Sequence, residues 1–126
     1  MGVYLGKKVI FVYNADSGIF NSIEDYVHKI VSPSTYGCNL CGLTYGNMGM
    51  KNNWKQYISG QKYPVEFLHK DVFFKKYNLD NVSFPCAYIE YNGKIELLIT
   101  SDEINYLGTL EELMLLVSKK LADISD

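Results

Sequence analysis

Two strand-like runs joined by Asn92-Gly93 constrain the fold of this chain more than any other feature. The first run is 86–91 and the second is 94–99, and both are rich in apolar and β-branched side chains. Asn-Gly tolerates the positive φ angles of a type I′ turn, which is the turn that best matches the twist of paired strands. The sequence therefore predicts an antiparallel β-hairpin over 86–99.

The segments before the hairpin alternate between strand and helix patterns. Residues 8–13 form an apolar run that predicts a buried strand, and 65–69 predict a second one. Between them, 22–31 carry apolar residues at helical spacing until Pro33, 33–47 are expected to form a loop, and 54–60 a short helix ending at Gly60. Asp71 is expected to cap a helix through Tyr77. A helical crossover implies that the first two strands are parallel.

A last helix is predicted to follow the hairpin. Thr109 and Glu112 have the spacing of a capping box, and apolar residues then recur on one helical face as far as Leu121. The complete order is strand, helix, insertion, strand, helix, hairpin, helix, which indicates an α/β protein. At 126 residues the chain is long enough for one domain with its own core, so 1–126 are expected to form a single domain.

Composition excludes several classes of function. The net charge is −2 and the chain has no arginine, so neither a basic surface for nucleic acid nor bidentate recognition of phosphate is expected. No run of apolar residues reaches membrane-spanning length, and no secretory signal pattern is present. The cytoplasm is the expected location. Three cysteines in that compartment favour free thiols, a metal site or redox chemistry over a disulfide scaffold.

The pattern Cys38-Asn39-Leu40-Cys41 carries the clearest chemical signal. Such a pair can exchange between dithiol and disulfide, in which case we expect an accessible pair with one thiol at a helix N-terminus. It can also supply half of a structural zinc site, with His28 as the most plausible third ligand. A third possibility is that both cysteines are inert and pack among apolar neighbours. The residues alone leave all three open.

Other candidate residues gather at the ends of the predicted strands. The edge of the sheet at which ligands of open α/β sheets bind is expected to hold six residues: Asp16, Ser17, His69, Asp71, Pro85 and Cys86. His69 is the best general acid–base candidate, although a structural role is the more common one for such a histidine. Cys86 is expected to be a buried strand residue.

The element order and Ser83-Phe84-Pro85-Cys86 resemble the thioredoxin-like family, whose core is βαβ followed by ββα. That resemblance implies that Pro85 is the family's cis proline before the third core strand. The family's CxxC opens the helix after the first strand, where this chain reads Asp16-Ser17-Gly18. Its active-site thiols are therefore not carried over. The pair lies instead in an insertion, 33–62.

The chain also resembles a set of short proteins without an established activity. They share Tyr-Asn-Ala-Asp-Ser-Gly, here 13–18, and a Cys-x-Leu-Cys-x-Leu-Thr-Tyr-Gly segment, here 38–46. The resulting hypothesis is a thioredoxin-like protein whose displaced Cys38/Cys41 pair exchanges disulfides with a protein or a small thiol. This redox hypothesis needs no cofactor, whereas the alternative hypothesis of a structural metal site on Cys38 and Cys41 needs zinc. A non-catalytic interaction module is the third reading.

Overall fold

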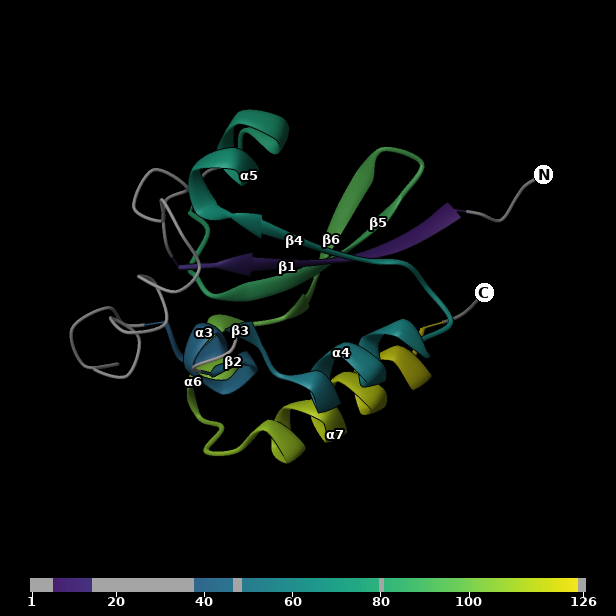
Figure 1. Cartoon of the computed structure of the whole chain (residues 1–126). Helices are drawn as coiled ribbons and strands as arrows, with labels where there is room; N and C mark the ends of the chain where they lie inside the picture. Colours follow the sequence, from purple (N-terminus) through teal and green to yellow (C-terminus); the bar gives the residue numbers. More distant parts are fainter. Residues whose placement is uncertain (1–5, 15–37, 47–48, 80, 125–126) are drawn as a thin grey trace.

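A mixed four-stranded sheet with helices on both faces forms the body of the protein (Figure 1). The computed structural model describes residues 6–14, 38–46, 49–79 and 81–124. The elements are β1 (Lys7–Tyr13), α3 (Asn39–Thr44), β2 (Tyr45–Gly46), β3 (Gly49–Met50), α4 (Asn52–Ser59), β4 (Val65–His69), α5 (Lys70–Tyr77), β5 (Cys86–Tyr91), β6 (Lys94–Ile99), α6 (Ser101–Asn105) and α7 (Leu110–Ala122). The α/β class predicted from the sequence is confirmed.

The strand order of the sheet is β4-β1-β5-β6. β1 runs parallel to β4, with Val9 beside Val65, and antiparallel to β5, with Val12 beside Cys86. β5 and β6 form the predicted hairpin, and Asn92 and Gly93 have φ angles of 54° and 81° at its turn. The central position of β1 explains its continuous apolar run, because both of its faces are covered.

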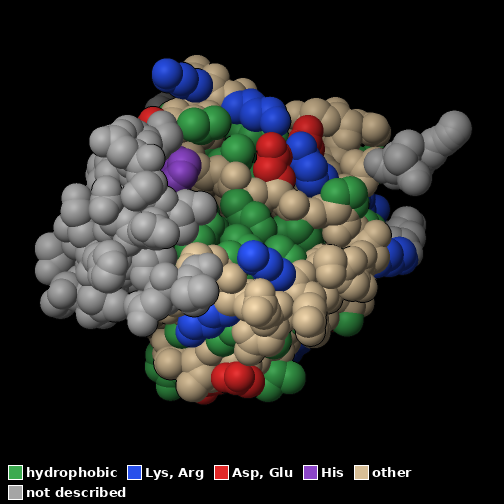
Figure 2. All heavy atoms as spheres, in the orientation of Figure 1, with side chains coloured by type: hydrophobic (Ala, Val, Ile, Leu, Met, Phe, Trp, Pro, Cys, Tyr) green, Lys and Arg blue, Asp and Glu red, His purple; other side chains and the backbone are tan. Residues whose placement is uncertain are grey.

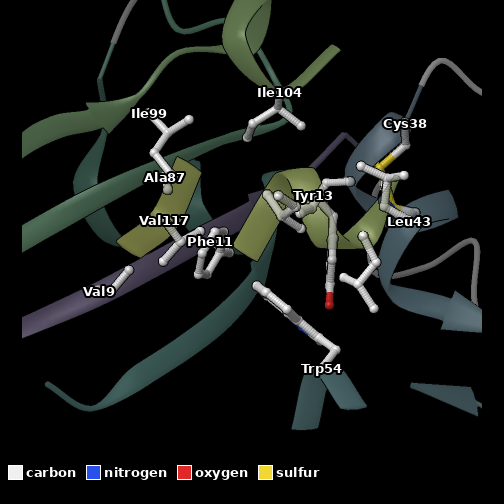
Figure 3. Packing of buried hydrophobic residues seen from close by; sticks show 14 of the residues in the cluster. Val9, Phe11, Tyr13, Cys38, Leu43, Trp54, Ala87, Ile99, Ile104 and Val117 are labelled. Carbon is white, nitrogen blue, oxygen red and sulfur yellow. Dashed lines mark hydrogen bonds between the residues drawn. A yellow bond between two sulfur atoms is a disulfide. The ribbon is translucent and has the colours of Figure 1, made fainter. Parts of the chain in front are cut away.

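Alternate residues of β1 point into two separate cores. Val9, Phe11 and Tyr13 face α3, α4, α6 and α7, which bring Leu40, Trp54, Ile104 and Leu113 to that side of the sheet. Figure 3 shows Trp54 and Ile104 beside the residues of β1. Ile10 and Val12 face the other way and pack against Phe73 of α5. The larger core therefore contains the described part of the 33–62 insertion, which is an integral layer of the fold.

Capping explains where the last two helices begin. Thr109 accepts a hydrogen bond from the Glu112 amide, and the Glu112 side chain returns to the Thr109 amide, as predicted. A second capping box, Thr100 with Glu103, starts α6 in the same way and was not predicted. Each such cap is worth about 1 kcal/mol.

Two local predictions are wrong. Residues 39–44 form a helix rather than a loop, because Leu40, Cys41 and Leu43 find an apolar core to occupy. Helix α5 starts at Lys70 with His69 as its N-cap, so Asp71 lies in the first turn and does not cap it. The helix predicted over 22–31 lies outside the described residues.

Candidate functional site

Cys38 and Cys41 form a disulfide at the start of α3. Their Cα atoms are 5.4 Å apart, within the predicted range of 4.4–6.8 Å. The two cysteines are three residues apart in sequence. A loop this short adds only about 2 kcal/mol on a chain-entropy estimate, less than longer disulfide loops. The bond is therefore a weak structural constraint.

Cys38 is the N-cap of α3, and its sulfur takes the place of the usual capping oxygen. The Cys38 Sγ accepts a hydrogen bond from the Cys41 amide at 3.3 Å. The Cys38 carbonyl accepts from the Gly42 amide at 3.2 Å and starts the helical ladder. An amide that donates to this sulfur stabilises the thiolate more than the thiol. The prediction that one sulfur lies at a helix start is confirmed.

The pair is buried, so the predicted accessibility is wrong. Cys38 is 2% exposed and Cys41 is fully covered, and both belong to the larger core with Leu40 and Leu43. The apolar neighbours that make 38–44 helical are the same ones that cover the sulfurs. Exchange with any partner therefore requires α3 to move away from its packing.

Asn39, inside the CxxC, binds α3 to the turn between α6 and α7. Its Nδ2 donates to the carbonyl of Ile104 at 2.8 Å and to that of Leu107 at 2.9 Å. Both carbonyls lie where α6 ends and the turn toward α7 begins. The amide thus satisfies two acceptors at a helix end and fixes the helix that carries the disulfide.

Replacing Asn39 with alanine is expected to cost about 1–3 kcal/mol of unfolding free energy, because two partly buried carbonyls each lose a hydrogen bond. The Ile104 carbonyl keeps the Leu107 amide as a donor. The same change should make the disulfide easier to reduce with dithiothreitol, because α3 is held less firmly. Urea denaturation and the rate of reduction measure the two effects. Asn105→Ala, an exposed change on α6, is the control and should change both by little. Equal reduction rates for both variants would contradict the role given to Asn39.

Helix α3, which carries the disulfide, lies at the end of the sheet at which β1 and β4 terminate (Figure 1). Tyr13, the last residue of β1, has its ring 6.0 Å from that of Tyr45, which directly follows α3. Their hydroxyl groups are 3.4 Å apart. The Tyr13 ring also lies 5.7 Å from the His69 ring at the end of β4. His69 is thus at the predicted edge, on the face of the sheet that carries the disulfide.

Pro85 and Cys86 lie at the same edge but do not join the disulfide. The Phe84–Pro85 bond is cis and Pro85 is buried. Cys86 stands beside Val12 in the ladder and packs in the smaller core with Phe73, on the opposite face from Cys38 and Cys41. The sheet therefore separates the third cysteine from the pair.

Cys86 is a free, buried thiol, as expected from the sequence. Burial raises the pKa of this thiol from 9.0 to about 12. The folded state favours the neutral thiol over the thiolate. The stabilisation of the folded state by this neutral thiol is therefore complete below about pH 9, and it is lost as the pH rises toward 12. We expect iodoacetamide to leave Cys86 unmodified at pH 8 in the native protein and to modify it in urea, as peptide mass mapping will show. Rapid native modification would contradict this environment.

His28, the third ligand predicted for the zinc alternative, lies outside the described residues. The same holds for Asp16 and Ser17, which were predicted at the ligand-binding edge of the sheet. Within the described ranges, no group of three or more His, Cys, Asp or Glu side chains could hold a metal ion. The sulfurs of Cys38 and Cys41 are bonded to one another, and only thiolates bind zinc well.

Asn39 and Tyr13 are the functional-site residues that sequence reasoning missed. Asn39 was visible as a polar residue inside the CxxC, but its acceptors lie 65 and 68 positions away in sequence. The sequence predicts Tyr13 only as the end of a buried strand and as the first residue of the 13–18 segment. No local pattern indicates either contact, because both depend on how α3 docks.

Comparisons with known proteins assign no family. No family model matches the chain, and no solved structure matches it. A 1,4-alpha-glucan branching enzyme, GlgB, from Picrophilus torridus is 24% identical over 92 residues, which cover 70% of this chain and 13% of the enzyme. The chain thus spans about an eighth of that relative's length. No helix among the described residues is long and apolar enough to cross a membrane.

Proposed function

We propose that this chain is a thioredoxin-like redox protein in which Cys38 and Cys41 exchange between dithiol and disulfide. The observation that carries the proposal is the Cys38–Cys41 disulfide with the Cys41 amide donating to the Cys38 sulfur at the start of α3. The sheet order β4-β1-β5-β6 and the position of Pro85 directly before β5 support the thioredoxin-like part. The weak structural value of so short a disulfide loop also favours a chemical role.

The reaction has two steps with balanced electrons and protons. In the reduced protein, the Cys38 thiolate attacks a partner disulfide R–S–S–R, forms a mixed disulfide and releases one R–S⁻. Cys41, after losing its proton, attacks the Cys38 sulfur, forms the observed disulfide and releases the second R–S⁻. The two protons lost by the cysteines leave with the two partner thiols. Two molecules of a small thiol such as glutathione return the pair to the dithiol.

Cys38 is assigned the attacking role for two reasons. Its sulfur accepts the amide hydrogen bond that would stabilise a thiolate, and it is slightly exposed whereas Cys41 is not. Movement of α3 away from the turn after α6 would expose both sulfurs, with the Asn39 hydrogen bonds broken.

Catalysis of exchange between glutathione and a disulfide-bonded model peptide tests the proposal. The wild-type protein should accelerate the exchange, and Cys86→Ala should act like the wild type. The double variant Cys38→Ala/Cys41→Ala should give the rate without protein. A protein whose rate equals that of this double variant would refute a redox function. Zinc content of the reduced protein should stay far below one ion per chain, whereas one tightly bound ion would support the metal alternative.

A further inference from the structure

A groove lies between α4 and β4, away from the disulfide. It has a volume of about 590 Å³. Residues from the end of α4, the following turn and the start of β4 line it: Lys55, Ile58, Ser59, Gln61, Lys62, Tyr63, Pro64 and Val65. Figure 2 shows apolar side chains gathered on this face of the molecule, with basic side chains beside them. The groove combines an apolar floor with positive charge.

The strand that borders the groove has an open hydrogen-bonding edge. β4 is the last strand of its sheet and pairs with β1 on one side. The Val9 amide donates to the Pro64 carbonyl at 2.9 Å, and Val9 is the partner of Val65. In a parallel ladder with this register, the N–H and C=O groups of Val65 and Phe67 point away from β1. Within the part of the chain that the structure describes, no backbone group pairs with them.

The charge of the groove favours an acidic occupant. Lys55 and Lys62 are both exposed at its rim, and no described carboxylate lies within ion-pair distance of Lys55. Glu66 is the acidic residue of β4, and Lys8 at 2.9 Å and Lys76 at 4.0 Å engage its carboxylate. An acidic ligand at this edge would therefore meet two lysines and a carboxylate whose charge is already offset.

We propose that the open edge of β4 binds an extended peptide segment of a partner protein whose side chains facing α4, at every second position, include both acidic and apolar residues. The segment adds a strand beside Val65 and Phe67 through backbone hydrogen bonds. Its apolar side chains rest on Ile58 and Tyr63, and its carboxylates lie beside Lys55 and Lys62. A second copy of this chain is the competing occupant of the edge, and the measurements below distinguish it from a peptide.

The test is an NMR titration of the full chain labelled with ¹⁵N. The probe is a pool of blocked heptapeptides in which the second, fourth and sixth residues are drawn from Asp, Glu, Val, Ile, Leu and Phe, and the other residues are Ser or Thr. We expect saturable shifts of the Val65 and Phe67 amides, and at least tenfold weaker binding by the variant Lys55→Glu/Lys62→Glu. Lys94→Glu, at the opposite edge of the sheet, is the matched control and should bind as the wild type does.

Two further measurements separate the alternatives. A pool with Lys in place of Asp and Glu should leave the Val65 and Phe67 amides unshifted. The same amides should not shift with protein concentration when no peptide is present. The proposal is overturned if the acidic pool produces no saturable shift, if both pools act alike, or if concentration alone moves these amides, which would indicate self-association. None of these measurements depends on Cys38 or Cys41. A negative result for the proposed redox function would therefore leave the proposed peptide binding intact, and the reverse also holds.

Discussion

Replacing Trp54 with alanine is expected to lower the free energy of unfolding by about 3–5 kcal/mol, one of the largest effects of any single change in this chain. Trp54 is fully buried at the centre of the larger core. Its ring meets that of Phe11 edge-on, with 5.7 Å between centroids (Figure 3). It also stacks on Tyr57 at 5.7 Å and lies 6.4 Å from the ring of Phe67. Alanine would leave a cavity between α4 and the sheet.

Urea denaturation followed by far-ultraviolet circular dichroism measures this effect. Trp54→Phe should retain much of the stability, because it keeps an aromatic ring in the same space. Leu115→Ala is the control, since Leu115 is 71% exposed on α7 and its removal should change stability by less than about 0.5 kcal/mol. A loss below about 1 kcal/mol for Trp54→Ala would show that α4 does not pack on the sheet as described.

The largest effect on chemistry is expected from removing one cysteine of the pair at a time. In a Cys86→Ala background, Cys41→Ser should accumulate a mixed disulfide between Cys38 and glutathione, because no second thiol remains to release it. Cys38→Ser should accumulate much less, because Cys41 is fully buried, whereas the Cys38 sulfur accepts a hydrogen bond from the Cys41 amide at the start of α3. Intact-protein mass under non-reducing conditions measures both products. Equal amounts from the two variants would contradict the assignment of Cys38 as the attacking residue.

Local signals predicted most of the regular structure. The hairpin over 86–99 followed from Asn92-Gly93, and α7 followed from Thr109 and Glu112, because turns and caps depend on residues close in sequence. The strand β1 followed from its apolar run, which reflects burial on both faces. These elements could be predicted without knowing which other elements they pack against.

The segment around the CxxC could not be predicted in the same way. Its glycines and polar residues favour a loop, and the helix α3 exists because Leu40 and Leu43 pack on distant elements and Asn39 binds the turn after α6. Burial of the sulfurs is a consequence of that docking. Sequence identified the pair of cysteines, whereas tertiary contacts decide how exposed they are and which face of the sheet they occupy.

The central claim is that Cys38 and Cys41 form a reversible redox pair. Equilibration of the native protein with a series of glutathione redox buffers, followed by acid quenching, alkylation and mass analysis, tests it most directly. The account predicts a single two-electron transition, in which two thiols appear together at Cys38 and Cys41 while Cys86 stays reduced throughout. A pair that remains fully reduced or fully oxidised in every buffer would contradict it.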